Sequence, residues 1–338
     1  MTPAKTSVHP ALATDPKIQR NAALHLGLDI GGTNLRLGVF RGLRLLSEYR
    51  TAPDLSEVCR HAGNREDAQR LVVRLVGDAI ADALCKHKQV QHIGMGIPGF
   101  VDPGNSLLLQ SPNLQHLENT DLISPLQKRF SLPVCLVNDA NAAAYGEYLL
   151  ARPHHSDLRH LLYVGLGTGI GGGLVLNGQV YPGAHGSALE IGHLIVEPNG
   201  RVCGCGNRGC LEQYASASGV KLSYTEYTGC HKTARDIGQM ADAGDRSARQ
   251  AFWQAGRALG QALAHLQKIL DADLVCIGGG LIGSWPWMAP AVQSALDADL
   301  IPILRGRTRI TPSSSADCAG MLGAAYIGLE TAEVPHDE

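Results

Sequence analysis

The sequence predicts an α/β protein made of two similar halves. Short aliphatic runs bounded by glycine or proline are typical of strands, and longer segments place apolar residues at helical spacing. The order of these segments begins again near residue 159 of the 338. Each half opens with a strand that runs into a glycine-rich turn, at 29–34 and at 167–171. Two similar halves also predict a cleft between them, where ligands usually bind.

The first half is predicted to open with an antiparallel meander. Leu24–Ile30 and Leu35–Phe40 flank the first glycine-rich turn, and a third strand runs from Leu43 to Tyr49. Apolar residues at helical spacing then predict a helix over 65–86. The remaining elements are a strand at 92–98, a helix at 121–130, a strand at 134–137 and a helix at 140–151.

The second half repeats this order. Strands are predicted at 161–166 and 173–178, around the second glycine-rich turn. A helix over 246–271 carries an apolar stripe, which indicates a place in the core or at a subunit contact. The other predicted elements are strands at 274–277 and 307–311 and helices at 211–219, 233–243, 287–299 and 318–330.

The sequence predicts two domains and a tail. Residues 1–22 are rich in Pro, Thr and Ala without periodicity, which indicates a flexible N-terminal tail. An N-terminal α/β domain is expected at 23–137, rejoined by the last helix at 318–331. The larger C-terminal domain is expected at 138–317.

Composition excludes several classes of function. The net charge is −2 with no long run of one sign, so neither nucleic acid nor an anionic membrane is an expected partner. No apolar stretch is as long as the ~18 residues of a transmembrane candidate. An odd count of 9 cysteines and the absence of a signal-peptide-like stretch disfavour an oxidised secreted protein. We therefore expect a cytoplasmic protein.

Three cysteines and a histidine predict a metal site. Cys203, Cys205 and Cys210 fall within eight residues separated mainly by glycine, and His193 lies ten residues upstream of Cys203. Three sulfurs and one imidazole nitrogen form a closed tetrahedral shell, which is typical of structural zinc. Disulfides or incidental buried thiols are the alternatives. Glu190 and Glu212 flank these ligands, so a metal would fix two carboxylates around a polar substrate.

The two glycine-rich turns indicate phosphate binding. Backbone N–H groups in such turns form sites for anions. Gly167, Gly169 and Gly172 match G-x-G-x-x-G, but a strand follows where a dinucleotide fingerprint needs a helix. The chain contains no Gly-Lys pair and hence no Walker A loop. Either turn alone could be an ordinary tight turn, whereas equivalent turns in two similar halves favour nucleotide binding.

Asn138-Asp139 and Asp29 are candidate polar groups at strand ends. Asn138 and Asp139 end a buried strand and begin a helix, where both residue types are also favoured as helix caps. Strand ends facing a cleft are likewise where α/β proteins place reactive groups. Asp139 could then accept the proton of a substrate hydroxyl that attacks phosphorus. Asp29, which could be only a turn residue, suits a hydrated Mg²⁺ beside phosphates.

Taken together, these motifs resemble the ROK family of sugar kinases and related repressors, over about residues 24–330. The first and second phosphate motifs correspond to Asp29-Ile-Gly-Gly-Thr-Asn-Leu-Arg36 and Leu166-Gly-Thr-Gly-Ile-Gly-Gly-Gly173. Glu190-Ile-Gly-His193 and Cys203-x-Cys205-x4-Cys210-x-Glu212 resemble two signatures specific to the family. The resemblance implies an actin-like (ribonuclease H-like, hexokinase-type) duplicated two-domain fold with a cleft between the lobes.

The resemblance also implies a role for individual residues. Asp139 would be the catalytic base, and His193, Cys203, Cys205 and Cys210 would hold zinc. The sugar contacts would come from Asn113, Asn138, Asp139, Glu190, His193 and Glu212. ATP and Mg²⁺ would be bound by Asp29, Gly31, Gly32, Thr33, Asn34, Arg36, Gly167, Thr168 and Gly169, with Gly278, Gly279 and Gly280 against the adenosine. Many members carry Gly where this chain has Leu189, which puts the identity of the sugar in doubt.

The implied activity is transfer of the ATP γ-phosphate to the 6-hydroxyl of a hexose, with glucose as the first candidate. N-acetylglucosamine, N-acetylmannosamine, allose or fructose could replace glucose, and polyphosphate could replace ATP. The family commonly forms dimers, so we expect a homodimer. A sugar-responsive repressor is not expected, because only 28 residues without helical periodicity precede Asp29. A non-catalytic sensor is disfavoured by the retained acidic residues.

Overall fold

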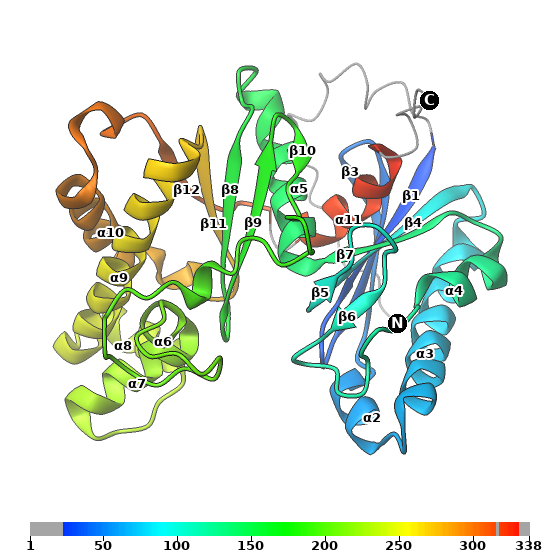
Figure 1. Cartoon of the computed structure of the whole chain (residues 1–338), viewed down its shortest axis with the longest axis horizontal. Coiled ribbons are helices and arrows are strands. Elements are labelled where there is room, and N and C mark those ends of the chain that lie inside the picture. Colours follow the sequence, from blue (N-terminus) through cyan, green and yellow to red (C-terminus); the bar gives the residue numbers. More distant parts are fainter. Residues whose placement is uncertain (1–22, 316–317, 331–338) are drawn as a thin grey trace. The chain divides into compact units, whose positions relative to one another are not determined.

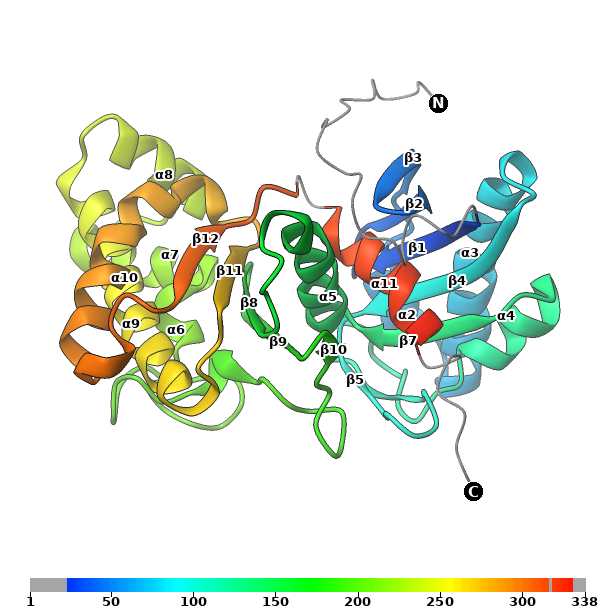
Figure 2. The same ribbon diagram turned by 90° about the horizontal axis from the view of Figure 1, so that it is seen from above.

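The computed structural model describes residues 23–315 and 318–330, and the predicted tail at 1–22 lies outside them. The described residues form two compact units. Unit 1 contains the residues up to Leu158, Gly178–Ala188 and the residues from Ser315 onward. Unit 2 contains Arg159–Asn177 and Leu189–Ser314. Figures 1 and 2 label the elements of both units.

Unit 1 is built on a five-stranded sheet with the order β3-β2-β1-β4-β7. Strand β1 pairs antiparallel with β2 and parallel with β4, and β4 pairs parallel with β7. The strands are β1 (Leu24–Ile30), β2 (Leu35–Arg41), β3 (Arg44–Thr51), β4 (Val90–Ile97) and β7 (Val134–Asn138), with a small separate hairpin of β5 (Phe100–Val101) and β6 (Leu108–Gln110). The helices are α2 (Leu55–His61), α3 (Arg65–Lys86), α4 (Ile123–Phe130), α5 (Asp139–Ala151), the short η1 (Arg152–His154) and α11 (Ala319–Glu330).

Helix α11 packs closely on the sheet of unit 1 because glycines lie under it. A Cβ atom at Gly27 of β1 would overlap the carbonyl of Met321, and one at Gly94 of β4 would overlap that of Ala324. Gly146 of α5 in turn contacts the carbonyl of Ala319. These three positions let backbone meet backbone, so the last helix completes the core of the first unit.

The second five-stranded sheet has the order β10-β9-β8-β11-β12. Four of its strands belong to unit 2, namely β8 (Leu161–Leu166), β9 (Ile170–Leu176), β11 (Leu274–Gly278) and β12 (Arg309–Pro312), whereas the edge strand β10 (Gln179–Val180) lies in the segment Gly178–Ala188 that groups with unit 1. The helical elements are η2 (Ile191–His193), α6 (Glu212–Ala215), α7 (Ala217–Thr228), α8 (Ala234–Asp242), α9 (Arg246–Leu270), η3 (Ile282–Ser284), α10 (Trp285–Asp299) and η4 (Pro302–Leu304).

The long helix α9 carries the core of unit 2. Phe252, Leu259 and Leu263 of the predicted apolar stripe are completely buried, which places the stripe in the core. Helices α9 and α10 lie side by side (Figure 1). Gly256 and Gly260 allow this approach, because a Cβ atom at either would overlap a carbonyl of α10.

The two sheets have the same strand order, which confirms the predicted α/β fold with two similar halves. The sequence-based division after Val137 differs from the two units: residues 138–158 group with unit 1, because α5 packs along α11.

Helix α2 was not predicted, and the helix predicted at 211–219 is interrupted at Ser216, the N-cap of α7. Among the described helices, none is long and apolar enough to cross a bilayer.

Candidate functional site

Two carboxylates of unit 1 lie at the carboxyl ends of β1 and β7, two parallel strands that are separated by β4. Asp29 of β1 is in register with Gly96 of β4, and Gly96 is in register with Val137 of β7. Asp139 follows two residues after Val137 as the first residue of α5. Adjacent strands are ~4.8 Å apart, and Gly96, which separates the two acids, has no side chain. A Cβ atom at Gly96 would lie 3.3 Å from that of Ala142 and 3.7 Å from the Cα atom of Asp139, so α5 packs closely on β4 beside the two acids.

Asn138 is the cap of α5. Its Oδ1 accepts a hydrogen bond of 3.0 Å from the N–H of Asn141, and its Nδ2 donates one of 2.9 Å to the carbonyl of Gly99. Capping and attachment to Gly99 thus use both ends of this amide. The capping role considered for Asn138-Asp139 therefore holds for Asn138, while the half-buried Asp139 carboxylate also accepts from the N–H of Ala140 at 2.8 Å.

The first glycine-rich turn is closed by its own backbone and supported by α2. The N–H of Gly31 donates to the carbonyl of Asn34 at 2.8 Å, and the N–H of Ser56 donates to that of Gly32 at 2.9 Å. The Ser56 hydroxyl donates to the carbonyl of Asn113 at 2.9 Å. The backbone of Asn113, a predicted sugar contact, is therefore held beside the turn that is predicted to bind phosphate. The side chains of Thr33 and Asn34 are exposed.

Arg36 is engaged within the sheet. Its Nε and Nη2 atoms donate to the Glu48 carboxylate at 3.2 and 3.0 Å, and Arg50 donates to the same oxygen. Burial opposes ionisation of Glu48, but hydrogen bonds from Arg50 and Arg36 outweigh it and hold the pKa of that carboxyl below its ordinary value. The predicted phosphate contact would require Arg36 to exchange or share this partner.

The second glycine-rich turn and the glycine triplet meet in unit 2. Gly165 of β8 is in register with Gly278 of β11, so the segments that follow both strands start side by side. Gly279 has φ +87° and packs on the backbone of Leu166, and the N–H of Leu281 donates to the Leu166 carbonyl at 3.0 Å. A side chain at position 279 would be both strained and obstructed. The turn 167–169 and the triplet 278–280 are therefore close neighbours.

The carboxylate of Glu212 rests on the second turn. Its Oε2 atom accepts a hydrogen bond of 3.0 Å from the N–H of Ile170. A Cβ atom at Gly169 would overlap this oxygen. The turn predicted to hold phosphates and the acid predicted to hold the sugar are therefore in direct contact.

The segment Glu190–His193 also packs on the strand that leaves this turn. A Cβ atom at Gly172 would overlap the carbonyl of Leu189, and one at Gly192 would meet the carbonyl of Ile170. The glycines of the two motifs therefore allow η2 to lie against β9, and this contact places Glu190 and His193 near Glu212.

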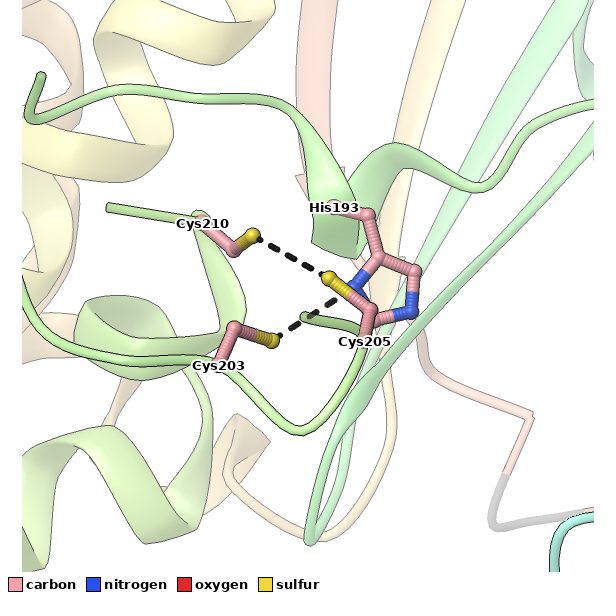
Figure 3. Close-up of side chains that lie close together, drawn as sticks. All are labelled: His193, Cys203, Cys205 and Cys210. Carbon is pink, nitrogen blue, oxygen red and sulfur yellow. Dashed lines mark hydrogen bonds between the residues drawn. The ribbon is translucent and has the colours of Figure 1, made fainter. Parts of the chain in front are cut away.

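His193 lies between the cysteines and Glu190. Its Nδ1 atom is 3.7 Å from the sulfur of Cys203, and its Nε2 atom is 3.8 Å from Oε2 of Glu190. The sulfurs of Cys205 and Cys210 are 3.6 Å apart, and ligand atoms of all four residues lie within 4.8 Å of one another. Figure 3 shows the four side chains pointing toward one another.

These distances fit a tetrahedral zinc site. With Zn–S near 2.3 Å and Zn–N near 2.0 Å, neighbouring ligand atoms of a tetrahedron are about 3.5–3.8 Å apart. A backbone hydrogen bond from Asn207 is the main cause that lowers the pKa of Cys205, which favours the thiolate that binds metal. Burial first, and the neighbouring cysteines next, raise the pKa of Cys210 to about 12. A divalent cation would relieve the repulsion among three thiolates at this site.

Burial raises the pKa of Glu190, and the charge of Glu212 adds to this effect while His193 opposes it. The two carboxylates are thus close enough to interact electrostatically. Hydroxyl groups of a sugar could donate to both.

Comparison with known proteins decides the family. The model of the ROK family matches residues 25–331. The chain belongs to the ROK family. The matched range contains the described part of both units except for the first two residues.

ROK relatives include enzymes and regulators. A glucokinase of Thermotoga maritima is 31% identical, over 89% of this chain and 96% of its own. An N-acetyl-D-glucosamine kinase of Pasteurella multocida is 30% identical, over 90% and 99%. A xylose repressor of Bacillus subtilis is 27% identical, over 92% of this chain and 78% of its own.

Solved ROK structures agree with the fold. A ROK hexokinase from Thermus thermophilus is 31% identical with a TM-score of 0.75, over 92% of this chain and 100% of its own. A ROK glucokinase from Streptomyces griseus, solved with glucose and AMPPNP, is 29% identical with a TM-score of 0.70, over 89% and 98%. These similarities confirm the actin-like, hexokinase-type class expected from the sequence.

Leu189 is the residue at which the sequence was expected to depart from the family pattern. Its φ is +64°, in the left-handed region that glycine adopts without cost. The Leu189 side chain packs against the hydrophobic core of unit 2. Leu189, directly before Glu190, therefore combines a strained backbone conformation with a side-chain contact to the core.

Sequence reasoning missed Arg201, which connects the metal loop to α6 and α7. Its guanidinium donates to the Gln213 carbonyl at 2.5 Å, to Ser223 at 3.0 Å and to Glu226 at 3.0 Å, and it lies 4.7 Å from the Tyr214 ring centre. The only signal in the sequence was a basic residue two positions before Cys203. Its partners are 12 or more residues away, so spacing could not identify them.

Proposed function

We propose that this chain is a hexose kinase that transfers the γ-phosphate of ATP to the 6-hydroxyl of its sugar, with glucose as the first candidate. The contact between Glu212 and the second glycine-rich turn carries the proposal, because it joins a sugar-binding acid to a phosphate-binding backbone within unit 2. The similarity to ROK glucokinases over nearly the whole chain supports the same reaction.

In this proposal Asp139 is the general base. It accepts the proton of the 6-hydroxyl while the oxygen forms a bond to the γ-phosphorus. The bond from phosphorus to the bridging oxygen of the β-phosphate breaks, and ADP leaves. A positioned base of this kind contributes typically ~10²–10⁴-fold to the rate, and positioning of the phosphates supplies much of the rest. The proposal requires Asp139 of unit 1 to reach the same hexose as Glu190 and Glu212 of unit 2.

The remaining residues bind and orient the substrates. Glu190, His193 and Glu212, with Asn113 and Asn138, would contact sugar hydroxyls. The turns at 31–34 and 167–169 would donate backbone N–H groups to the phosphates, and Gly278–Gly280 would lie against the adenosine. Asp29 would hold a hydrated Mg²⁺, which neutralises phosphate charge.

His193, Cys203, Cys205 and Cys210 would hold a structural zinc ion. The ion would fix the loop that carries Glu212 and the orientation of His193. His193 then keeps its Nε2 side toward Glu190 and the sugar, in the way that a metal-bound imidazole is commonly oriented by a carboxylate. Because four protein ligands would fill the coordination shell of the ion, no position would remain for water or substrate, and the zinc would have no part in phosphoryl transfer.

An N-acetylated hexose is the second candidate substrate. The relative that phosphorylates N-acetyl-D-glucosamine is almost as similar to this chain as the glucokinase, at 30% against 31% identity. The replacement of glycine by Leu189 directly before Glu190 is a further reason to test sugars with a larger substituent.

We also propose a homodimer, which light scattering of the purified protein would test.

Formation of the sugar phosphate, measured by mass spectrometry over a panel of hexoses, tests the function with either donor, and ADP release follows the reaction when ATP is the donor. The panel contains glucose, N-acetylglucosamine, N-acetylmannosamine, allose and fructose, each with ATP and with polyphosphate as donor. We expect sugar-dependent ADP formation with kcat/KM highest for glucose. The highest value for an N-acetylated sugar would support the second candidate, and no activity with any sugar and either donor would refute the kinase.

A further inference from the structure

Glu212 has an unusual position for a residue that binds a sugar. One of its carboxylate oxygens, Oε2, is occupied by the N–H of Ile170 in the second glycine-rich turn. For the other oxygen, Oε1, the described residues supply no hydrogen-bond partner. Hence one side of the carboxylate is attached to the turn, and the other side is available to a ligand.

The turn is attached to the same helical segment at a second point. The carbonyl of Gly167 accepts a hydrogen bond of 2.9 Å from the N–H of Ala217, the first residue of α7. Between the two attachment points, the buried Ser216 caps α7, and its hydroxyl donates to the Glu212 carbonyl at 2.6 Å. Residues 212–217 therefore follow any displacement of the turn 167–170.

Gly169 makes this attachment possible. A Cβ atom at position 169 would overlap Oε2 of Glu212 and would lie 3.2 Å from its Cδ atom, and its three nearest neighbours would all be side-chain atoms of Glu212. The backbone of Gly169 does not have a positive φ, so the requirement for glycine comes from the Glu212 carboxylate. A methyl group here would displace the end of a flexible side chain and leave the fold intact.

We propose that Glu212 couples the two substrate sites, so that a triphosphate bound at the turn 167–170 raises the affinity for the sugar through the Ile170–Glu212 hydrogen bond. This inference rests on the function proposed above and adds a path by which one substrate affects the other. Phosphate oxygens bound to the turn fix its N–H groups. The fixed turn holds Oε2 of Glu212 and thereby orients Oε1 toward a sugar hydroxyl. Linkage then requires the sugar to raise the affinity for the nucleotide by the same factor.

The test measures the dissociation constant of glucose by calorimetry, without nucleotide and with saturating AMPPNP, a nonhydrolysable ATP analogue. For the wild-type protein we expect the constant to fall at least fivefold when AMPPNP is bound, which is within the usual range of such couplings. Gly169→Ala should keep its zinc and its melting temperature, and the ratio of the two constants should fall to between one and two.

The matched control is Gly167→Ala in the same turn, where the Cβ atom would meet nothing closer than the Gly169 carbonyl oxygen at 3.8 Å. Even if this variant binds AMPPNP more weakly, its ratio at saturation should remain that of the wild type. Glu212→Asp breaks the same contact from the other side, because the shorter side chain cannot reach Ile170. The Glu212→Asp variant therefore tests the coupling even if Gly169→Ala does not bind AMPPNP. Its ratio of the two glucose dissociation constants should also lie between one and two.

A wild-type ratio in Gly169→Ala, or a wild-type protein whose glucose affinity is unchanged by AMPPNP, would overturn the coupling while leaving the kinase in place. Failure of the proposed function is a different result, in which the wild-type protein binds neither a hexose nor AMPPNP.

Discussion

His193 faces Cys203 with its Nδ1 atom and Glu190 with its Nε2 atom, at 3.7 and 3.8 Å. One imidazole thus connects the cysteine cluster to a carboxylate that is proposed to bind the sugar. A change at the cysteines is therefore expected to affect sugar binding as well as stability, although no cysteine touches the sugar. The predictions below separate such effects.

Cys205→Ser is expected to remove the zinc. A hydroxyl is a poor zinc ligand beside thiolates, so the metal content should fall from one ion per chain to none, measured by plasma mass spectrometry. Because metal binding contributes directly to folding, unit 2 should unfold at lower urea concentration, and glucose affinity should fall at least tenfold. The control is Cys230→Ser, the same exchange at an exposed cysteine of the same unit, which should retain zinc. A metal-free wild-type protein would contradict the assignment.

Asp139→Asn is expected to lower kcat at least a hundredfold and to leave the dissociation constant of glucose within tenfold of the wild-type value. The amide can still accept the N–H of Ala140, so α5 should begin normally, but the amide cannot take the proton of the hydroxyl. Steady-state kinetics and calorimetry measure the two quantities. Asp82→Asn, at an exposed position of α3, should leave both unchanged. Near-normal turnover in Asp139→Asn would remove Asp139 as the base.

Arg201→Lys is expected to destabilise unit 2 by roughly 2–4 kcal/mol, because lysine cannot replace the several hydrogen bonds that the guanidinium donates. All three tryptophans, Trp253, Trp285 and Trp287, lie in unit 2, so urea unfolding followed by tryptophan fluorescence reports on this unit. Arg208→Lys changes an exposed arginine of the same loop and should cost less than about 0.5 kcal/mol. Equal stability of the two variants would show that the Arg201 contacts contribute nothing.

His25→Leu is expected to reduce the loss of stability at acid pH. His25 is buried between His92 and Tyr326, and neither ring nitrogen has a hydrogen-bond partner among the described residues. Burial, with a smaller effect of His92, lowers the pKa of His25 to about 4 from 6.5. The unfolded chain therefore binds more protons between these values, and stability falls as pH decreases through this window.

Each pH unit between the two pKa values costs ~1.4 kcal/mol of folding free energy. Between pH 7 and pH 5, protonation of His25 in the unfolded chain therefore lowers the free energy of unfolding by about 2 kcal/mol. Leucine fills a similar volume and does not titrate. Both proteins would lose zinc at acid pH, so the difference between their losses of unfolding free energy is the contribution of His25 alone. Urea unfolding at both pH values, followed by far-ultraviolet circular dichroism, measures it. The same pH dependence of the free energy of unfolding in both proteins would refute the lowered pKa of His25.

Local patterns were sufficient to predict the duplicated fold and the cysteine cluster. Alternating strands around two glycine-rich turns define β1, β2, β8 and β9, and their order was confirmed. Cys203, Cys205 and Cys210 are close in sequence, so their side chains can converge without distant partners. Gly172 and Gly192 were noted only as members of their motifs, but they also allow η2 to pack on β9, and the spacing of residues in the sequence does not reveal this contact.

Contacts between distant residues could not be predicted. Helix α2 has only seven residues, too few for a clear periodicity, although Asp54 followed by Glu57 is a cap signal that was present. Arg36 was assigned to phosphate because it closes a motif, whereas its partner Glu48 lies on another strand. The boundary after Val137 followed the repeat in the sequence, but the packing of α5 on α11 joins residues that are more than 160 positions apart.

The packing of α11 on the glycines of β1 and β4 affects how the protein is made. Of the two sheets, that of unit 1 is synthesised first, yet the part of β1 and β4 that α11 covers stays exposed until residues 319–330 have been synthesised. Unit 2 is complete before that moment, since its last segment ends at Ser314. Of the two units, unit 1 is thus the first to be synthesised and the last to be completed, and a nascent chain stalled before residue 319 would expose the apolar surface of β1 and β4 that α11 covers.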